Sequence, residues 1–545
     1  MRDYMTKLSK KLVFFILTIL TALLTFLYFA DKKEIWFCDE VYTYESANGF
    51  ESVWPRSILN TWMTGDDVNA FLSADSTEMG YTAISNNLYG DHVPLYFWIF
   101  RTVSVLFFMG SSSKWIGLSI NLVCYLVFIS FLFFLFEKAF KSSLLSMLAS
   151  VTLGIFNVLM MSQATMLRMY MLLVLETMLL LLCSFKVIER SFEYMNGTVA
   201  GSFTKKNIFL FASIAFVGLC GFLTHYDFWI FYGITAFATC FYLLAAAFIR
   251  RKKVGLFKNP CFYLVIGYVI SFIVALSLTI KLFPYCVWNL NKKNATGYSP
   301  LASLFVFTKD KLSDIAWGFS SISNVCVIDA KLLYLVIAAG GIVLIVKKKY
   351  PEFAKLALGV LVSILYQTVV SFTLPVARET RYLWCSYTVL LFAFGYSIVE
   401  IIMLLKPVIG KRIPIVVVTL VCITLSFMGI KSFDGGRAIP YLFYEDKDVE
   451  ALKANSEKPW IVYGGADDYA TFDFLNAESL IYIQGYEDKE EVRALRELEA
   501  AESFVLYVYP QDEDRAIDFI SEALGREVTK TYLTRSVNYL VYVCN

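Results

Sequence analysis

The stretch LVFFILTILTALLTFLYFA, residues 12–30, carries no charged side chain. The hydrocarbon core of a bilayer is about 30 Å thick, and a helix of about 20 residues crosses it. The basic segment 1–11, MRDYMTKLSKK, precedes this run, and no small-x-small cleavage pattern precedes Asp31. We therefore predict a retained signal-anchor helix whose basic flank stays in the cytoplasm.

The composition of the whole chain agrees with this start. Of 545 residues, 58% are hydrophobic and only 17% are charged, too few charges for the surface of a soluble protein. The formal net charge is +2 and no basic stripe is present, so we expect no nucleic acid as a partner. The 11 cysteines form no Cys-x-x-Cys pair, which leaves no zinc or redox motif. Cys286 and Cys326 fall in one predicted outer loop, where two free thiols are favoured over a disulfide.

Further apolar runs of similar length predict a polytopic α-helical membrane protein with about eleven transmembrane helices. These runs lie near residues 115–136, 144–161, 171–188, 207–224, 228–249, 261–281, 331–346, 354–373, 383–405 and 415–430. One more run, 94–110, is short and carries Arg101 at its centre.

Basic loops orient the predicted spans. The clusters lie at Lys138 and Lys141, Lys186 to Lys206, Arg250 to Lys253, Lys347 to Lys349, and Lys406 to Arg412. The positive-inside rule places all of them in the cytoplasm with the N-terminus. This works only if 94–110 does not cross, so we predict a juxtamembrane or re-entrant helix there, within a first outer loop at 31–114. The competing interpretation is a tilted span at 94–110 with another segment that fails to cross.

Two domains follow from this topology. Residues 1–430 form the predicted transmembrane domain, with a second large outer loop at 282–330, and residues 431–545 form an extracytoplasmic domain. About half of the chain's 46 Asp and Glu residues fall in this tail. Its strand-like runs WIVYG, SLIYI, SFVLYVY and YLVYVC alternate with the helix-like KEEVRALRELEA and DEDRAIDFISEAL, which predicts a small α/β domain. Its Gly464–Gly465 pair is interpreted as a turn.

The unusual polar residues collect at the predicted outer helix ends, and both histidines are among them. The segments are FCDEVYTYE with Asp39 and Glu40, GDHVPLYFW with Asp91 and His92, SQATMLRMY with Arg168 and Tyr170, LTHYDFW with His225 and Asp227, and ARETRYLW with Arg378, Glu379, Arg381 and Tyr382. Taken singly, each has a structural interpretation as a solvated loop, a lipid-headgroup anchor, a turn residue or a helix cap. Ionisable groups near the bilayer are costly unless paired or hydrated, so the joint pattern predicts a hydrated cavity.

Such a cavity suits a phosphate ester. Arginine binds phosphate bidentately and keeps its charge, and a buried acid suits a general base. An apolar groove open to lipid would take an isoprenoid tail. We therefore predict a transferase in which a base deprotonates an acceptor hydroxyl, the hydroxyl attacks an anomeric carbon, and a lipid phosphate leaves, stabilised by arginine.

The ordered motifs also resemble a family. They are Asp39–Glu40, Asp91-His92-Val93-Pro94-Leu95-Tyr96, Arg168-Met169-Tyr170 and Arg381–Tyr382. Together they resemble the C-superfamily (GT-C) membrane glycosyltransferases, above all the family of the protein O-mannosyltransferases and the lipid A aminoarabinose transferase. The tail 431–545 resembles the periplasmic domain of the latter. The proline pair common in the family's His-Pro-Pro motif is Val93–Pro94 here.

The resemblance implies an inverting glycosyltransferase of the plasma membrane that uses a polyprenyl-phosphate sugar. The acceptor hydroxyl would belong to a glycan, a lipid or a protein. By resemblance, the catalytic residues are Asp39 and Glu40, the donor phosphate is held by Arg168, Arg381, His225 and Arg378, and the substrate cavity is lined by Asp91, His92, Tyr96, Tyr170 and Tyr382. No cofactor is implied. The first outer loop has no Asp-x-Asp near Asp39, which argues against an obligatory divalent metal ion.

Two alternatives belong to other classes. A transporter or lipid flippase would show two-fold internal repeats and broken helices at mid-membrane, and no such halves are visible in the sequence. A non-catalytic scaffold, binding a partner through its outer domain, would leave Asp39, Arg168 and Arg381 more than about 15 Å apart, beyond the reach of a shared reacting atom.

Overall fold

The computed structural model describes most of the chain. The described residues are 2–48, 59–74, 80–88, 92–196, 205–249, 255, 259–287, 309–373, 379–410, 412–434, 447–464, 470–486 and 488–545. Two predicted site residues, Asp91 and Arg378, lie outside these ranges, as do Gly465 and residues 288–308 of the predicted loop 282–330.

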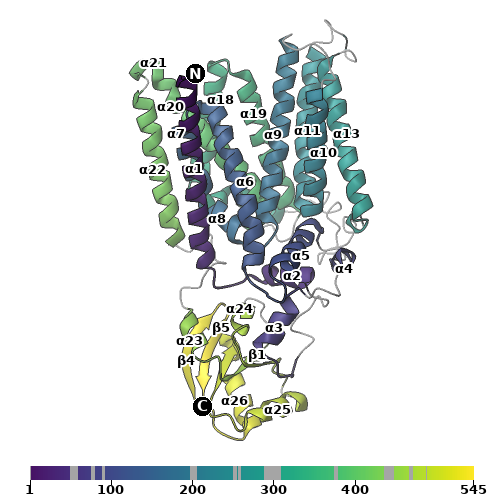
Figure 1. The fold of residues 1–545 in the computed structure, drawn as a ribbon, viewed down its shortest axis with the longest axis vertical. Coiled ribbons are helices and arrows are strands. Elements are labelled where there is room, and N and C mark those ends of the chain that lie inside the picture. Colours follow the sequence, from purple (N-terminus) through teal and green to yellow (C-terminus); the bar gives the residue numbers. More distant parts are fainter. Residues whose placement is uncertain are drawn as a thin grey trace.

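Figure 1 shows a bundle of long helices with a small sheet domain beyond one of its ends. The N-terminus lies at the opposite end of the bundle, and the C-terminus lies in the sheet domain. Among the described residues, nine helices are long and apolar enough to span a bilayer. They are α1 (Arg2–Asp31), α6 (Trp115–Phe140), α9 (Tyr170–Met195), α10 (Lys205–Thr224), α11 (Tyr226–Ile249), α13 (Pro260–Leu282), α19 (Tyr350–Thr373), α20 (Trp384–Ile402) with its flanking turns, and α22 (Arg412–Asp434).

Two bent helix pairs bring the total to eleven when each pair counts as one span. In the first, α7 (Ser143–Ser150) and the π-helical turn Val151–Ile155 meet α8 (Val158–Thr165) at 62°. In the second, α16 (Lys309–Ser320) and α17 (Ile322–Cys326) meet α18 (Ala330–Val346) at 93°. The prediction of a polytopic helical protein is therefore confirmed, but the apolar run 144–161 is a broken helix and not a continuous one.

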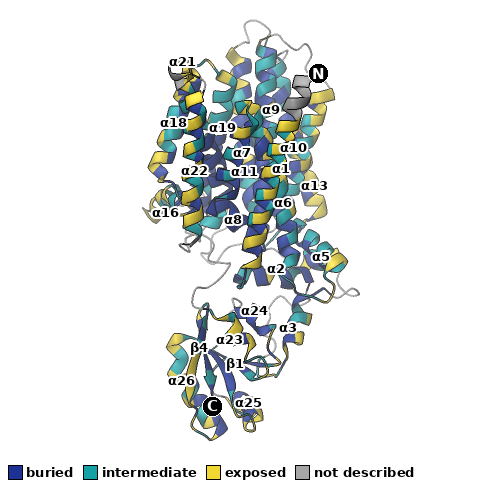
Figure 2. Ribbon diagram, turned by 60° about the vertical axis from the view of Figure 1, so that its left-hand side comes forward, coloured by how far each residue is buried: buried dark blue, intermediate teal, exposed yellow. Residues whose placement is uncertain are grey.

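The outward faces of the bundle are apolar. Phe209 on α10, Phe237 on α11 and Leu335 on α18 are among the most exposed large side chains. In Figure 2 exposed positions lie along the outside of the bundle, and buried positions fill its centre. In the most apolar stretch of the central helix α9, 67% of the residues are buried, against 22% in the corresponding stretches of α1 and α22. Exposed apolar side chains on long helices are the pattern of a lipid-facing surface.

The segment 94–110 forms the helix α5 (Leu95–Phe107), whose 13 residues extend over about 20 Å. That is too short for the hydrocarbon core of a bilayer, about 30 Å thick. In Figure 1 it lies below the bundle beside α2 (Cys38–Asn48), on the side of the sheet domain. The short helices α3 (Gly65–Leu72) and α4 (Tyr81–Asn87) lie in the same region.

The tail contains a five-stranded sheet in the order β2-β1-β3-β5-β4. Its strands are β1 (Pro459–Tyr463), β2 (Ser479–Ile483), β3 (Phe504–Val508), β4 (Lys530–Ser536) and β5 (Tyr539–Cys544). β1 runs parallel to β2 and β3, whereas β5 is antiparallel to β3 and β4. The tail also holds the helices α23 (Val449–Lys453), α24 (Thr471–Phe474), α25 (Lys489–Leu495) and α26 (Glu513–Leu524). The α/β prediction is confirmed, and β4 is the strand that the sequence patterns missed.

The two faces of this sheet have different neighbours. Ile461 and Leu506 on one face pack in a cluster with Leu495 of α25 and Ile520 of α26. Alternate residues, such as Val462 on the other face, belong to the apolar cluster that continues into the helical bundle. The sheet domain therefore shares a hydrophobic core with the membrane domain. Gly464 ends β1 with a φ of 88°, which fits its interpretation as a turn residue.

Candidate functional site

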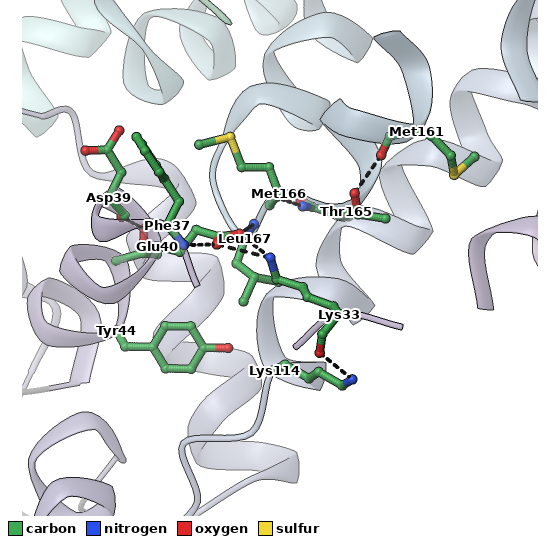
Figure 3. Close-up of polar contacts among 12 residues, drawn as sticks. Lys33, Phe37, Asp39, Glu40, Tyr44, Lys114, Met161, Thr165, Met166 and Leu167 are labelled. Atoms are coloured by element: carbon green, nitrogen blue, oxygen red, sulfur yellow. Dashed lines mark hydrogen bonds and ion pairs between the residues drawn. The ribbon is translucent and has the colours of Figure 1, made fainter. Parts of the chain in front are cut away.

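Asp39 lies in the first turn of α2, immediately after the extended segment that leaves α1. The carbonyl of Phe37 accepts the first hydrogen bond of this turn from the Glu40 amide, at 2.7 Å. Acidic residues in the first turn are favoured by the positive end of the helix dipole. Figure 3 shows the Asp39 side chain turned away from that of Glu40, so the two adjacent carboxylates have different surroundings.

The Asp39 carboxylate forms an ion pair with Arg381, with 2.8 Å between Oδ2 and Nη1. The side chains are only 20% and 11% exposed. Arg381 comes from the 3-10 turn Thr380–Leu383 ahead of α20. Its guanidinium lies over two aromatic rings, 4.8 Å from the centroid of Phe37 and 5.2 Å from that of Tyr382. These cation–π contacts hold the guanidinium beside Asp39.

Arg168 reaches the same place from the turn between α8 and α9. Its Nη1 donates to the backbone carbonyl of Asp39 at 2.9 Å and to Oγ1 of Thr43 at 3.0 Å. Its Nη2 lies 3.2 Å from Nε2 of His92. Arginine carries donors only, so the histidine nitrogen accepts this bond and the His92 proton sits on Nδ1. The four residues therefore form one connected network.

His225 lies between α10 and α11 and completes the cluster. Its Nδ1 accepts a hydrogen bond from the Asp227 amide at 3.1 Å, which leaves the ring proton on Nε2. Burial, followed by the charges of Arg168 and Arg381, lowers the pKa of His225 to about 3. Burial and Arg168 likewise hold the pKa of His92 well below its ordinary value. Both imidazoles are therefore neutral at neutral pH.

Two tyrosines surround His225. The ring centroid of Tyr170, at the start of α9, lies 5.8 Å from the imidazole, and that of Tyr382 lies 6.5 Å away. The Tyr382 carbonyl accepts a hydrogen bond from the hydroxyl of Tyr366 at 2.8 Å. Seven of the predicted site residues thus meet at one end of the bundle, namely Asp39, His92, Arg168, Tyr170, His225, Arg381 and Tyr382.

Glu40 and Tyr96 lie elsewhere. Glu40 is fully buried, and its carboxylate receives Lys33 Nζ at 3.0 Å, the Phe37 amide at 2.6 Å and the Leu167 amide at 2.5 Å. Burial raises the pKa of Glu40, while Lys33 and the two amides oppose that shift. Glu40 therefore ties the turn of Arg168 to the turn of Asp39, as Figure 3 shows, and does not face the Asp39 carboxylate.

Tyr96 is also fully buried. Its hydroxyl donates to Oδ1 of Asn121 at 3.4 Å, and Nδ2 of Asn121 donates to the carbonyl of Met166. Met166 stands at the start of the turn that carries Arg168. Through Asn121, Tyr96 is thus linked to the turn that carries Arg168.

Sequence reasoning missed Lys33, Phe37 and Thr43. Lys33 falls in DKKEIWF, seven residues before its partner Glu40, and a lysine in a predicted outer loop was the available signal. Phe37 and Thr43 flank Asp39 in the segment FCDEVYTYE, but neither a phenylalanine nor a threonine is unusual in a chain of this composition. Their roles appear only once the α2 turn is formed.

The unpartnered buried donors of the cluster favour an anion. The cluster contains the guanidinium groups of Arg168 and Arg381 and the carboxyl groups of Asp39 and Asp227, the latter with Oδ2 3.4 Å from Nδ1 of His225, and the two histidines are neutral. The Nε–H groups of both arginines are buried and have no hydrogen-bond partner among the described residues. Buried donors without a partner are rare. Among the described residues, no three His, Cys, Asp or Glu side chains are grouped to hold a metal ion.

The fold defines a polytopic helical membrane protein with a buried cluster of Asp, Arg and His side chains beside its sheet domain. No protein-family model matches the chain, and no curated protein matches it significantly. Among solved structures, ArnT from Cupriavidus metallidurans bound to undecaprenyl phosphate is similar over 97% of both chains, with 11% identity and a TM-score of 0.45. The apo state of the same protein gives 97% of both chains, 10% identity and 0.48. At these values the likeness assigns neither an activity nor a ligand to this chain.

Proposed function

We propose that this chain is an inverting glycosyltransferase that moves a sugar from a polyprenyl phosphate to a hydroxyl acceptor at the outer face of the membrane. One observation carries the proposal. A carboxylate, Asp39, lies 2.8 Å from a guanidinium that retains an unpartnered buried donor, and a second such guanidinium holds the Asp39 backbone. An acid beside an anion site is what transfer from a phosphate ester requires.

The donor phosphate would take the free Nε–H groups of Arg168 and Arg381. Charge-assisted hydrogen bonds from arginine to phosphate are short and strong. The Nε2–H of neutral His225 offers a further donor. Because the cluster sits at the end of a transmembrane bundle, a lipid-borne phosphate can reach it with its tail still among the apolar helices. ArnT from Cupriavidus metallidurans has been captured with undecaprenyl phosphate; for this chain a polyprenyl phosphate is inferred from its own arginines.

Asp39 would act as the general base. When phosphate occupies Arg381, the Asp39 carboxylate loses its partner and can accept the proton of the acceptor hydroxyl. The acceptor oxygen forms its bond to the anomeric carbon as the bond from that carbon to the phosphate oxygen breaks. The proton ends on Asp39, and the lipid phosphate leaves with the electron pair of the broken bond, stabilised by both arginines. A single displacement inverts the anomeric configuration.

The scaffold alternative expected these groups to lie apart, whereas Asp39 contacts both arginines. The transporter alternative expected broken helices, and the described residues contain two bent pairs, one of which has its break between α7 and α8. However, the polar residue at this break, Asn157, uses its side chain to accept the Leu159 amide at 3.1 Å as a helix cap. The ionisable cluster lies at the end of the bundle, not at the break.

A transfer assay tests the proposal. Membranes that contain the full-length chain are supplied with undecaprenyl phosphate carrying a radiolabelled sugar, taken from a panel of hexoses and pentoses, and the label leaving the lipid is followed. We expect Asp39→Asn to lower transfer by about 10²–10⁴-fold, the usual contribution of a general base. Asp31→Asn, an exposed acid at the end of α1, is the matched control. Wild-type transfer in Asp39→Asn would refute the proposed role.

A further inference from the structure

The first outer loop is hydrogen-bonded to the tail sheet. The Met63 amide donates to the Leu480 carbonyl at 2.8 Å, and the Leu480 amide donates back to Met63 at 2.7 Å. The Asn60 amide donates to the Tyr482 carbonyl at 2.9 Å, so the loop pairs with the free edge of β2. The indole of Trp62 adds a bond to the Ala494 carbonyl at 3.0 Å. The first outer loop, which begins with the segment of Asp39, is therefore hydrogen-bonded to the edge of the tail domain's sheet.

A buried lysine of the tail, Lys447, contacts the backbone of the segment that leads to Asp39. Lys447 Nζ donates to the backbone carbonyl of Glu34 at 3.0 Å and pairs with Oδ1 of Asp473 at 2.6 Å. The side chains of Lys447 and Asp473 are 1% and 4% exposed. Oδ2 of Asp473 is fixed by the hydroxyl of Ser536 at 2.5 Å, on β4. A buried ion pair gives little net stability by itself, and its best-attested use is to fix a register.

Aromatic packing holds the next residues. The ring of Trp36, fully buried, stacks on Tyr44 of α2 with 4.3 Å between centroids. The Trp36 ring centroid also lies 5.6 Å from that of Phe472, the neighbour of Asp473. The segment from Glu34 to Trp36 is therefore enclosed between the tail domain and α2. Asp39 follows three residues after Trp36, in the first turn of that helix.

We propose that the tail is a positioning domain for Asp39, in which the Lys447–Asp473 pair holds the Glu34 carbonyl and so sets the distance between Asp39 and Arg381. This inference rests on the proposed role of Asp39. Lys447 touches neither the carboxylate nor the arginines, so it acts through the backbone of residues 34–39. The arginines lie on the turns before α9 and α20, where Lys447 makes no contact.

The expected kinetic effect follows because Lys447 contacts the segment that leads to Asp39 but not the turns that carry the arginines. Loss of the pair shifts Asp39, which acts in the transition state, and leaves the arginines that bind the donor. Lys447→Met should therefore lower kcat by about tenfold or more while KM for the labelled undecaprenyl-phosphate sugar stays within about twofold. Lys453→Met on α23, whose partner Glu450 is exposed, is the matched control and should change neither constant.

Amide hydrogen exchange of the full-length protein without ligand tests the inference independently of activity. We expect Lys447→Met to raise exchange at residues 33–44 by about tenfold and to leave β1 and β3 unchanged. Asp473→Asn, which keeps the shape of the side chain, should act in the same direction and serves if Lys447→Met does not fold. Unchanged exchange at 33–44, or an equal rise in β1 and β3, would overturn the inference.

The two proposals fail separately. If Asp39→Asn transfers sugar normally but Lys447→Met loosens residues 33–44, the glycosyltransferase proposal fails and the coupling of the two domains stands. If Asp39→Asn is inactive while Lys447→Met keeps wild-type kcat and exchange, the positioning role fails and the proposed function stands.

Discussion

Adjacent carboxylates in this chain have opposite surroundings. Successive residues of a helix point about 100° apart, so a turn that directs Asp39 toward Arg381 directs Glu40 into the protein. Glu40 meets Lys33 and two backbone amides there and has no exposed surface. The motif Asp39–Glu40 was predicted to be a catalytic pair. The structure gives Glu40 the geometry of a residue that positions the Arg168 turn.

The buried ion pair of Lys33 and Glu40 leads to a stability prediction. Glu40→Gln leaves the Lys33 ammonium buried without a counter-charge, which costs about 3–5 kcal/mol in comparable cases. The double variant Lys33→Met, Glu40→Gln removes the stranded charge and should recover much of the loss. Thermal unfolding of the detergent-purified protein measures both. A single variant as stable as the wild type would contradict the buried ion pair.

The two neutral histidines lead to a prediction for acidic pH. The pKa of His225 falls from 6.5 to about 3 in the folded protein, so the unfolded chain binds the proton more readily. Stability from this group is full above about pH 6.5 and is lost as the pH falls toward 3. In melting scans between pH 4 and 8, His225→Asn should therefore lose less stability on acidification than the wild type. Parallel curves for the two proteins would show that His225 is not held neutral.

Much of the site was predictable from residue types alone. Asp, Arg and His are conspicuous in a chain with 17% charged residues, and charge alternation assigned them to one side. The direction of each side chain was not predictable, because it depends on turns such as the one that carries Arg168. The roles of Phe37 and Thr43 likewise depend on contacts with Arg381 and Arg168 from distant segments.

At the scale of elements, apolar composition located the spans but not their breaks. The run 144–161 is apolar throughout, yet the chain turns between the π-helical turn and α8, where Asn157 caps the new helix. Gly429 of α22 approaches the Phe156 carbonyl so closely that a Cβ would lie 1.9 Å from its oxygen. Such a contact between distant helices cannot be inferred from one run. β4 was missed because its first half is exposed and polar, as is common for an edge strand.

The short helix α5 leads to a prediction of topology. Because its 13 residues do not cross the bilayer, both of its flanks should face the same side. Cysteines placed at Tyr81 and Met109, both exposed, should be labelled in intact cells by a membrane-impermeant maleimide. Lys348→Cys, in a predicted cytoplasmic loop, should be labelled only after permeabilisation. Labelling of the two flanks from opposite sides would mean that α5 spans the membrane.

At the scale of the whole molecule, the sheet domain and the membrane domain share one apolar cluster. The pairing of Met63 with Leu480 joins residues more than 400 positions apart, and no local sequence pattern in either segment predicts this pairing. The sequence predicted a transmembrane domain followed by an α/β tail but gave no sign that the loop of Asp39 is hydrogen-bonded to the tail. That contact is what links the soluble part of the chain to the candidate site.

Mass spectrometry of the lipids retained by the detergent-purified protein tests directly whether the arginine cluster binds a polyprenyl phosphate. We expect a polyprenyl phosphate or its sugar ester with the wild type, and enrichment of the sugar ester with Asp39→Asn, which binds the donor without turning it over. The double variant Arg168→Ala, Arg381→Ala should retain neither. Equal retention of the lipid by all three proteins, or no polyprenyl phosphate with the wild type, would contradict donor binding by Arg168 and Arg381.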